Sequence, residues 1–361
     1  MHGGESLSVV VVLVVVAIAV VLVFRLPTVF VGGLALAAIF TGRYLKDQNR
    51  GHMEAPLYTG GQQATGVPSG RSLFSRLVTT MGPQSGKSGL QRARNFLEKK
   101  ALGALGVRGF GMEAVDIMEK GVNEKAGDAQ ILARLRAAWW RHPPKKPANQ
   151  EGRAQARIKE GAAYFEQERA AAKAPGYRYL DVGCSEGSIT AAVVAELGLS
   201  PEQAIATDVA FQTSPEGKLI ASPAFLFVQV DGSSLPFDDA TFDLITMYMS
   251  AHHFADARAM FAEAARVAKP GARLILREHG RADPAASLFY DFAHAFYETV
   301  AGEESTPEEF AARYARGTYA IYRPLDGWTR LAAVAGFKAT DWIPPLKDTF
   351  DTLLIRFVRE K

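Results

Sequence analysis

The sequence predicts an α/β protein with a doubly wound, mostly parallel sheet of seven strands, preceded by an N-terminal transmembrane helix and a helical linker region. Three observations support this fold class. Residues 7–24 are almost wholly apolar. From residue 177 onward, short runs of β-branched and aromatic residues alternate with segments of helical spacing. A glycine-rich turn, in "LDVGCSEGS", follows the first of these runs.

The predicted anchor occupies residues 1–40. At 1.5 Å per residue, "LSVVVVLVVVAIAVVLVF" (7–24) nearly crosses a hydrocarbon core about 30 Å thick. A cleaved signal peptide is the alternative, but "MHGGES" lacks the positively charged start that such a peptide needs. The second apolar segment, 28–40, is short for a span and could be re-entrant, interfacial or the return leg of a hairpin. The cations Arg43, Lys46 and Arg50 follow, so the positive-inside rule places the rest of the chain on the cytoplasmic side of the membrane.

The charge distribution and the cysteine content limit the kinds of binding partner and the cellular compartment that suit this chain. The net charge of the 361 residues is +3, yet residues 41–160 carry 21 Lys and Arg against 10 Asp and Glu, whereas 161–361 carry 19 against 27. The basic region favours anionic lipid head groups, and nucleic acid could use the same charges. The 48% of hydrophobic residues exclude a disordered protein. The single cysteine, Cys184, excludes a disulfide framework and suits a reducing compartment.

Two regions connect the anchor to the sheet. Residues 41–89 are predicted to be a flexible basic linker, because Gly, Ser, Gln and Pro dominate from Gly51 onward. Within it, "GPQSGKS" (82–88) imitates a phosphate-binding loop, but the spacing is one residue short and no strand precedes it. Residues 90–148 are predicted to be a helical basic region that ends at "PPKKP". Trp139 and Trp140 are expected to pack against the main domain rather than to anchor at a membrane interface.

The main domain is predicted to span residues 149–361. The expected strands are 177–184, 203–209, 225–231, 242–249 and 272–279, followed by 338–345 and 349–358 as an antiparallel closing hairpin. Helices are expected at 187–198, at 257–271 with its end at Pro270-Gly271, near 284–301 and at 327–337. An aromatic-rich insertion, 280–322, interrupts the sheet before the hairpin and is expected either to cover the acceptor as a lid or to serve as ordinary core.

The ligand of such a sheet lies beyond the carboxyl ends of its strands. After the first strand, Gly183 and Gly187 allow a tight turn, and the amides of the next helix face the ligand. After the second strand stands Asp208, some twenty positions past the turn, which is the placement that suits ribose hydroxyls. Together these residues indicate an adenosine-type ligand. Cys184 has no visible activating partner, so it is interpreted as packing rather than as a nucleophile.

Further motifs distinguish between the adenosine-containing cofactors that such a turn could bind. "LDVGCSEG", "DGSSLPFDDATFDLI" and "RVAKPGARLIL" resemble, in this order and spacing, the class I S-adenosylmethionine-dependent methyltransferases, particularly the methyltransferase type 11 group. The resemblance covers about 177–279 and implies a Rossmann-like methyltransferase fold with S-adenosyl-L-methionine as cofactor. A dinucleotide dehydrogenase fits worse, because "LPFDDATFD" and "KPGARL" have no part in its fingerprint. The cofactor-binding residues that the resemblance implies are Asp181, Gly183, Ser185 and Gly187 for the amino-acid part, Asp208 for the ribose, Asp231, Gly232 and Ser233 for the adenine, and Met249 in "MYMSAHHF" beside the sulfonium.

One position departs from the family pattern, which usually has glycine where this chain has Ser185. A required positive φ at this serine would cost about 1 kcal/mol and would weaken cofactor binding. Ser185 therefore favours a second hypothesis, a membrane-bound scaffolding protein whose methyltransferase-like domain has lost activity, whereas Asp208 and Asp231 favour the enzyme. "LDVGCSEGSIT" joined to "LILREH" is also similar to methyltransferase-like proteins of large DNA viruses, which implies a virion or viral-factory membrane as one location.

The candidate catalytic residues are His252, His253, Glu278 and His279, all predicted just past strand ends on the ligand side. A general base is needed only when the methyl acceptor is an oxygen, a protonated nitrogen or an acidic carbon. The alternative is that these side chains hydrogen-bond the loop backbone. No cluster with zinc-ligand spacing and no RNA-recognition module is evident in the sequence, so no metal is expected. The expected acceptor is a small molecule, lipid-soluble or otherwise held at the membrane.

Overall fold

The computed structural model describes residues 72–80, 88–142, 150–209, 224–302, 304–317, 319–343 and 350–360, all within the unit formed by residues 58–361. The predicted anchor segments 7–24 and 28–40 lie outside the described residues, as do most of the predicted linker and most of the phosphate-loop-like stretch. In the part of the chain that the structure describes, no helix combines the length and the apolar character needed to cross a membrane.

A seven-stranded sheet forms the centre of the main domain, with the strand order β3-β2-β1-β4-β5-β7-β6. The strands are β1 (Tyr179–Val182), β2 (Ala204–Asp208), β3 (Leu226–Gln229), β4 (Phe242–Tyr248), β5 (Ala268–His279), β6 (Phe337–Ile343) and β7 (Thr352–Arg359). The first five run parallel, and β7 is antiparallel to both β5 and β6. The predicted mostly parallel sheet and its antiparallel closing hairpin are therefore confirmed.

The strand order reverses between β1 and β4, and this reversal places the ligand edge of the sheet. Every residue of β1 is buried, and β4 is buried except at Asp243, because both strands have helices on both of their faces. The carboxyl ends of β1 and β4 diverge into different connections, and such a switch point opens a crevice for a ligand. The glycine-rich turn begins directly after β1, at this crevice.

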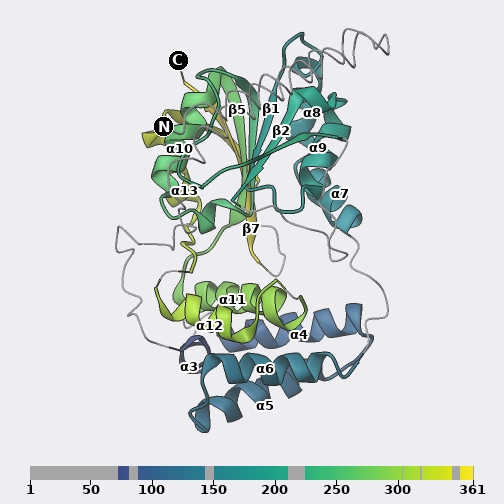
Figure 1. Ribbon diagram of the computed structural model, residues 1–361, viewed down its shortest axis with the longest axis vertical. Coiled ribbons are helices and arrows are strands. Elements are labelled where there is room, and N and C mark those ends of the chain that lie inside the picture. The colour runs from purple at the N-terminus through teal and green to yellow at the C-terminus, as the bar shows by residue number, and fades with distance from the viewer. Residues whose placement is uncertain are drawn as a thin grey trace, which may run out of the picture. The chain divides into compact units, whose positions relative to one another are not determined.

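Helices cover the two faces of the sheet (Figure 1). On one face lie α7 (Gln150–Glu160), α8 (Ala162–Ala171) and α9 (Ser188–Leu197), and on the other lie α10 (Ala257–Val267) and α13 (Leu325–Val334). The wholly buried side chains of Val193 on α9 and Phe261 on α10 belong to separate apolar clusters, one for each face. The sheet thus separates two cores, as a doubly wound fold requires.

One predicted helix end is wrong. The sequence places the end of the 257–271 helix at Pro270-Gly271, but α10 ends at Val267 and β5 begins at Ala268. Ala268 pairs with Phe242 of β4, and the backbone N–H of Thr241 donates to the carbonyl of Val267 at 2.7 Å. Pro270 cannot continue a helix, so the preceding residues join the sheet and a bulge takes up the register shift.

A second, helical layer combines two segments that are far apart in the sequence. From the N-terminal side come α3 (Leu73–Thr79), α4 (Gly89–Ala104), α5 (Phe110–Asn123) and α6 (Asp128–Trp139); from the insertion come α11 (Pro284–Ala295), the π-helical turn η3 (Phe296–Val300) and α12 (Pro307–Ala315). Their apolar side chains form one buried cluster, and the helices lie side by side in Figure 1. The ring of Phe96 lies edge-on against four other rings at 5.3–5.9 Å, namely those of Phe289, Phe296, Tyr297 and Phe350.

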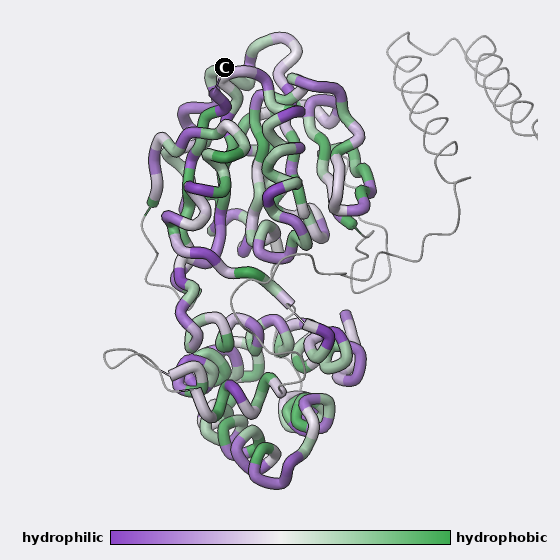
Figure 2. Tube along the Cα trace, turned by 90° about the vertical axis from the view of Figure 1, so that its left-hand side faces the viewer, coloured by the Kyte–Doolittle hydropathy of each residue, from purple (hydrophilic) through white to green (hydrophobic). Residues whose placement is uncertain are grey.

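This packing changes the predicted boundaries around the linker. Helix α3 falls inside the predicted flexible linker 41–89, yet Leu73, Phe74 and Leu77 are wholly buried. Along α4 to α6 hydrophobic and hydrophilic residues are interspersed, as expected for helices with one packed face (Figure 2). The expected packing is confirmed for Trp139, which is 4% exposed and lies edge-on against Phe296 at 5.0 Å. Trp140 is 42% exposed, although its indole N–H donates to the carbonyl of Val300 at 2.8 Å.

Candidate functional site

The turn after β1 requires glycine at two positions. Gly183 has φ +79°, and a Cβ there would lie 2.4 Å from the Cβ of Ser250. Gly187 has φ +75°, and a Cβ there would lie 2.3 Å from the ring of Phe225. Gly187 also begins α9, and no side chain of the described residues caps that helix end. The first amides of α9 are therefore available to an anionic group such as a carboxylate.

Ser185 has a φ of +51°, which is the strained, positive-φ conformation named above as costly for a serine at this position. This geometry costs about 1 kcal/mol for a residue with a Cβ. The backbone N–H of Ser185 donates to Oδ2 of Asp208 at 2.7 Å, and Oδ1 of Asp208 accepts from the N–H of Val209 at 2.7 Å. The Asp208 carboxylate therefore contacts the glycine-rich turn through the backbone of Ser185, and its role at the ribose stays a prediction.

Asp181 lies beneath the turn rather than on its ligand side. Its Oδ2 accepts from the hydroxyl of Thr190 at 2.6 Å and its Oδ1 from the hydroxyl of Thr246 at 2.7 Å. The side chain is 1% exposed, and this burial raises the pKa of the Asp181 carboxyl to about 6. Because both oxygens are already bonded, Asp181 joins β1 to β4 and α9 as a positioning residue. The direct cofactor contact that the family resemblance implies for it is not what this geometry offers.

The remaining predicted cofactor residues follow the neighbouring strands. After β3, the carboxylate of Asp231 accepts from the N–H of Ser233 at 2.8 Å and from its hydroxyl at 2.6 Å, and Gly232 between them has φ +79°. After β4, Met249 has φ +58°, and its N–H donates to the carbonyl of Arg277 at 2.7 Å. Since β3, β2, β1 and β4 are consecutive in the sheet, these residues lie along one edge, beside the glycine-rich turn.

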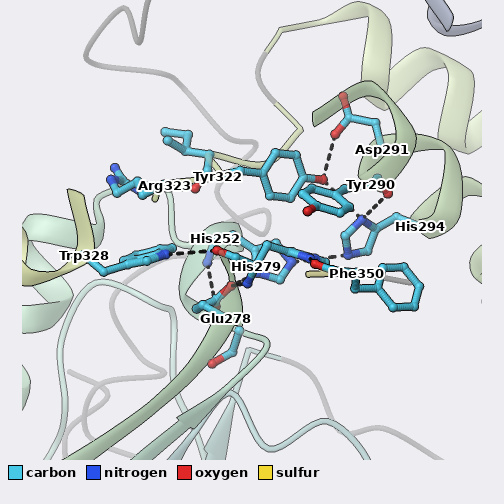
Figure 3. Close-up of polar contacts among 12 residues, drawn as sticks. His252, Glu278, His279, Tyr290, Asp291, His294, Tyr322, Arg323, Trp328 and Phe350 are labelled. Carbon is cyan, nitrogen blue, oxygen red and sulfur yellow. Dashed lines mark hydrogen bonds and ion pairs between the residues drawn. The ribbon is translucent and has the colours of Figure 1, made fainter. Parts of the chain in front are cut away.

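Three of the four predicted catalytic residues, His252, Glu278 and His279, meet at the same edge (Figure 3). The ring of the fourth, His253, lies 4.1 Å from the ring of His252. His252 and His253 lie in the 3₁₀ turn η2 (Ala251–His253) after β4, and Glu278 and His279 end β5. Nδ1 of His252 lies 2.7 Å from Oε2 of Glu278, and the backbone N–H groups of His252 and His279 also donate to this carboxylate at 3.2 Å. Both side chains of the His252–Glu278 pair are fully buried. Burial raises the pKa of Glu278 to about 7 and lowers the pKa of His252.

The insertion adds residues that the sequence did not identify. Nε2 of His294, on α11, lies 3.2 Å from Nε2 of His252. The N–H of Ile321 donates to the carbonyl of His252 at 2.8 Å, so the segment before α13 lies on the 3₁₀ turn. The hydroxyl of Tyr322 donates to Asp291 at 2.8 Å. No sequence motif surrounds His294 in "DFAHAFYE", and only the tertiary packing reveals its place.

Comparison with known proteins finds relatives that align with the part of the chain that contains the parallel strands and the glycine-rich turn. Residues 180–276 match the model of a methyltransferase domain family. Over 171 residues the chain is 30% identical to a demethylmenaquinone methyltransferase of Corynebacterium kroppenstedtii, an alignment that covers 46% of this chain and 71% of that protein. Over 103 residues it is 34% identical to the methyltransferase YcgJ of Bacillus subtilis, covering 28% of this chain but only 40% of that protein. The crystal structure of YcgJ aligns with a TM-score of 0.37 and 18% identity, over 55% of this chain and 98% of that one.

Proposed function

We propose that this chain, which belongs to the S-adenosylmethionine-dependent methyltransferases, methylates a small, lipid-soluble acceptor bound beside His252. The cofactor of the family is S-adenosyl-L-methionine, and the residues of this chain fit it. The uncapped amides of α9 suit its carboxylate, and the Asp208 carboxylate beside Ser185 suits its ribose hydroxyls. Bound there, the cofactor supplies a methyl group already activated on a sulfonium.

The observation that carries the proposal is the proximity of the glycine-rich turn to the His252–Glu278 pair. Ser250 packs against Gly183, and its hydroxyl donates to the carbonyl of Val182 at 2.8 Å. His252 follows only two residues later. An acceptor beside His252 would therefore lie next to the cofactor turn, where the protein has to align the reactants and exclude water. Nε2 of His252 is the atom at which a proton from the acceptor could be received.

The surroundings of His252 and His279 favour an aromatic or quinone-like acceptor. The ring of His279 stacks on Tyr290 at 4.0 Å and lies 5.2 Å from Tyr322 and 5.8 Å from Phe350. Aromatic side chains of this kind suit contact with a planar apolar molecule that has few polar groups. Relatives named as demethylmenaquinone methyltransferase and as ubiquinone/menaquinone biosynthesis C-methyltransferase support the same class of acceptor.

We further propose that the chain is attached to a membrane through residues 1–40, with the methyltransferase domain on the cytoplasmic side and the basic region 41–160 near anionic lipids. The apolar run 7–24 and the cations that follow residue 40 support this attachment. The likeness to proteins of large DNA viruses would place the same arrangement on a virion or viral-factory membrane. Deletion of residues 1–40 should release the chain from sedimented vesicles in high salt, and full salt-resistant retention would refute the anchor.

Calorimetric titration of the full chain with S-adenosylmethionine tests the function. Asp208→Ala should weaken binding by about 1.5–3 kcal/mol, the range for a hydrogen bond to a charged group. Asp326→Ala is the matched control, because that carboxylate is exposed on α13 and pairs only with Arg330 among the described residues. Equal affinity of the Asp208 variant and the wild type would remove the proposed ribose contact. A wild-type chain that binds no cofactor would favour the scaffolding alternative, which the strain at Ser185 supports.

Methyl transfer itself is tested with labelled cofactor and a panel of quinols, membrane lipids, proteins and RNA. The expected product is a methylated small molecule of the quinol type. His252→Ala should lower turnover by about 10²- to 10⁴-fold while leaving cofactor affinity unchanged. Label found only in protein or RNA would refute the acceptor class. Unchanged turnover in the His252 variant would remove that residue from the reaction.

A further inference from the structure

We propose that His252, His279 and His294 bind one divalent transition-metal ion, of the zinc type, at the carboxyl ends of β4 and β5. Nothing in the spacing of these residues indicates such a site, because they come from η2, β5 and α11. The ring nitrogens by which they could bind an ion nevertheless all lie within 4.8 Å of one another. The sequence-based expectation of no metal considered neighbouring residues only. The inference rests on the proposed acceptor site, which it deepens.

Each ring is oriented by an oxygen that accepts a hydrogen bond from its Nδ1. His252 has the Glu278 carboxylate at 2.7 Å, His294 has the carbonyl of Tyr290 at 2.8 Å, and His279 has the carbonyl of Phe350 at 3.4 Å. A carbonyl can only accept, so Nδ1 is the donor in His279 and His294. For His252 we assign the same tautomer, with Nδ1 donating to an ionised Glu278 that also accepts two backbone N–H groups. All three Nε2 atoms therefore carry lone pairs. Histidines that bind metals are oriented in this way.

The lone pairs face one another without a proton between them. Nε2 of His252 and Nε2 of His294 are 3.2 Å apart, and both are acceptors in the tautomers set by their partners. Nε2 of His279 is buried and has no hydrogen-bond partner among the described residues. Two facing lone pairs and a third buried one are unfavourable unless a cation or a proton lies between them. Three convergent acceptors exceed what one shared proton satisfies.

The distances suit a tetrahedral ion. Zinc binds imidazole nitrogen at about 2.0–2.1 Å, so two ligand nitrogens of a tetrahedral site lie about 3.3 Å apart. The His252–His294 separation of 3.2 Å already agrees with this value. The widest separation in the trio is at most 4.8 Å, so the third ring has to move by no more than about 1.5 Å to complete the set.

Burial and charge support a cation at this place. His252 and His279 are 1% and 2% exposed, and His294 beside them is partly buried. Two carboxyl groups flank the trio. Glu278 contacts His252, and Asp291 accepts from the hydroxyl of Tyr322, which lies 3.3 Å from Nδ1 of His294. A divalent ion would be compensated by both carboxylates.

Three imidazoles select the class of ion and leave room for a ligand. Neutral nitrogen ligands favour zinc, cobalt, nickel or iron over magnesium and calcium, which prefer oxygen. Three histidines with an open fourth position are typical of catalytic rather than structural zinc sites. An ion in this place would occupy the lone pair on Nε2 of His252, so in place of proton removal by that nitrogen it would lower the pKa of an acceptor hydroxyl in the fourth position. Its role would explain why the buried His252 and His279 lie beside the partly buried His294.

The test measures the binding of metal ions by the full chain, which is purified without a polyhistidine tag and stripped of metal with a chelator. Titration with zinc or cobalt should give one ion per chain, and bound cobalt should show the intense visible absorption of a tetrahedral site. His294→Ala should lower the affinity by at least about 100-fold, and Glu278→Gln by about 10- to 100-fold through the lost orientation of His252. His142→Ala is the matched control, a histidine at the end of α6 outside the trio, and should bind as the wild type does.

Folding of each variant is checked by circular dichroism and thermal melting, and His294→Gln repeats the measurement with a side chain closer in volume. A wild-type chain that takes up no zinc or cobalt at micromolar concentration overturns the proposal, and so does binding that survives the loss of any two of the three histidines. Methylation at the full rate by a chain without bound metal would overturn the ion's role at the acceptor while the proposed function stands. One ion per chain without methylation of any acceptor would support the site and refute the proposed function.

Discussion

Replacement of Gly183 by alanine tests the geometry of the cofactor turn. The added Cβ would lie 2.4 Å from Cβ and 2.8 Å from Oγ of Ser250, whereas contacts shorter than 3.0 Å essentially never occur for a real Cβ. Ser250 cannot retreat freely, because its hydroxyl donates to the carbonyl of Val182 at 2.8 Å. The φ of +79° adds about 1 kcal/mol of backbone strain, and overpacking adds about 1–3 kcal/mol. We expect the free energy of unfolding to fall by about 2–4 kcal/mol.

The matched control is Gly198→Ala at the other end of α9. Gly198 has φ +67° and nothing within 4 Å of the added Cβ, so this change costs only the backbone strain of about 1 kcal/mol. Urea unfolding of the full chains, followed by circular dichroism, compares the midpoints. In the Gly183→Ala/Ser250→Gly double variant, the overpacking contribution should disappear relative to Ser250→Gly alone. Equal losses in the two alanine variants would refute the predicted collision between Gly183 and Ser250.

The remaining predictions concern pH and the domain boundary. Burial raises the pKa of Asp291 from 3.8 to about 7, so the folded state holds this proton more tightly than the unfolded state. The contribution of Asp291 to the free energy of unfolding should be full below about pH 4 and fall as the pH rises to 7. Asp291→Asn should reduce this fall in the urea midpoint, and an unchanged pH profile would contradict it. A 149–361 fragment exposes Leu288, Phe289 and Phe292 of α11, whereas 72–361 keeps them covered. Size-exclusion chromatography should show aggregation of the shorter fragment only, and a monomeric 149–361 fragment would show that the helical layer is dispensable.

The elements predicted with most success are those encoded over a few consecutive residues. The runs that became β1 to β7, the glycine-rich turn and the acids after β2 and β3 were all predicted, because side-chain periodicity and turn chemistry are local properties. The end of α10 and the start of β5 were predicted at the wrong residues, because the pairing of Ala268 with Phe242 in the sheet overrode the local helix signal. The predicted anchor and the cytoplasmic location stay predictions, because residues 7–24 and 28–40 lie outside the described part of the chain.

Local sequence determined the methyltransferase fold and the residues that we propose for the cofactor, since both follow from short-range patterns along the strands and turns. Only the tertiary structure decided that Asp181 is held by Thr190 and Thr246 beneath the turn and that Ser185 has a positive φ. It also brought His294 to His252, although 41 residues separate them in the sequence. The reason is physical: hydrophobic burial drives α11 onto α3 and α4, and this packing, which no local pattern encodes, sets which side chains meet.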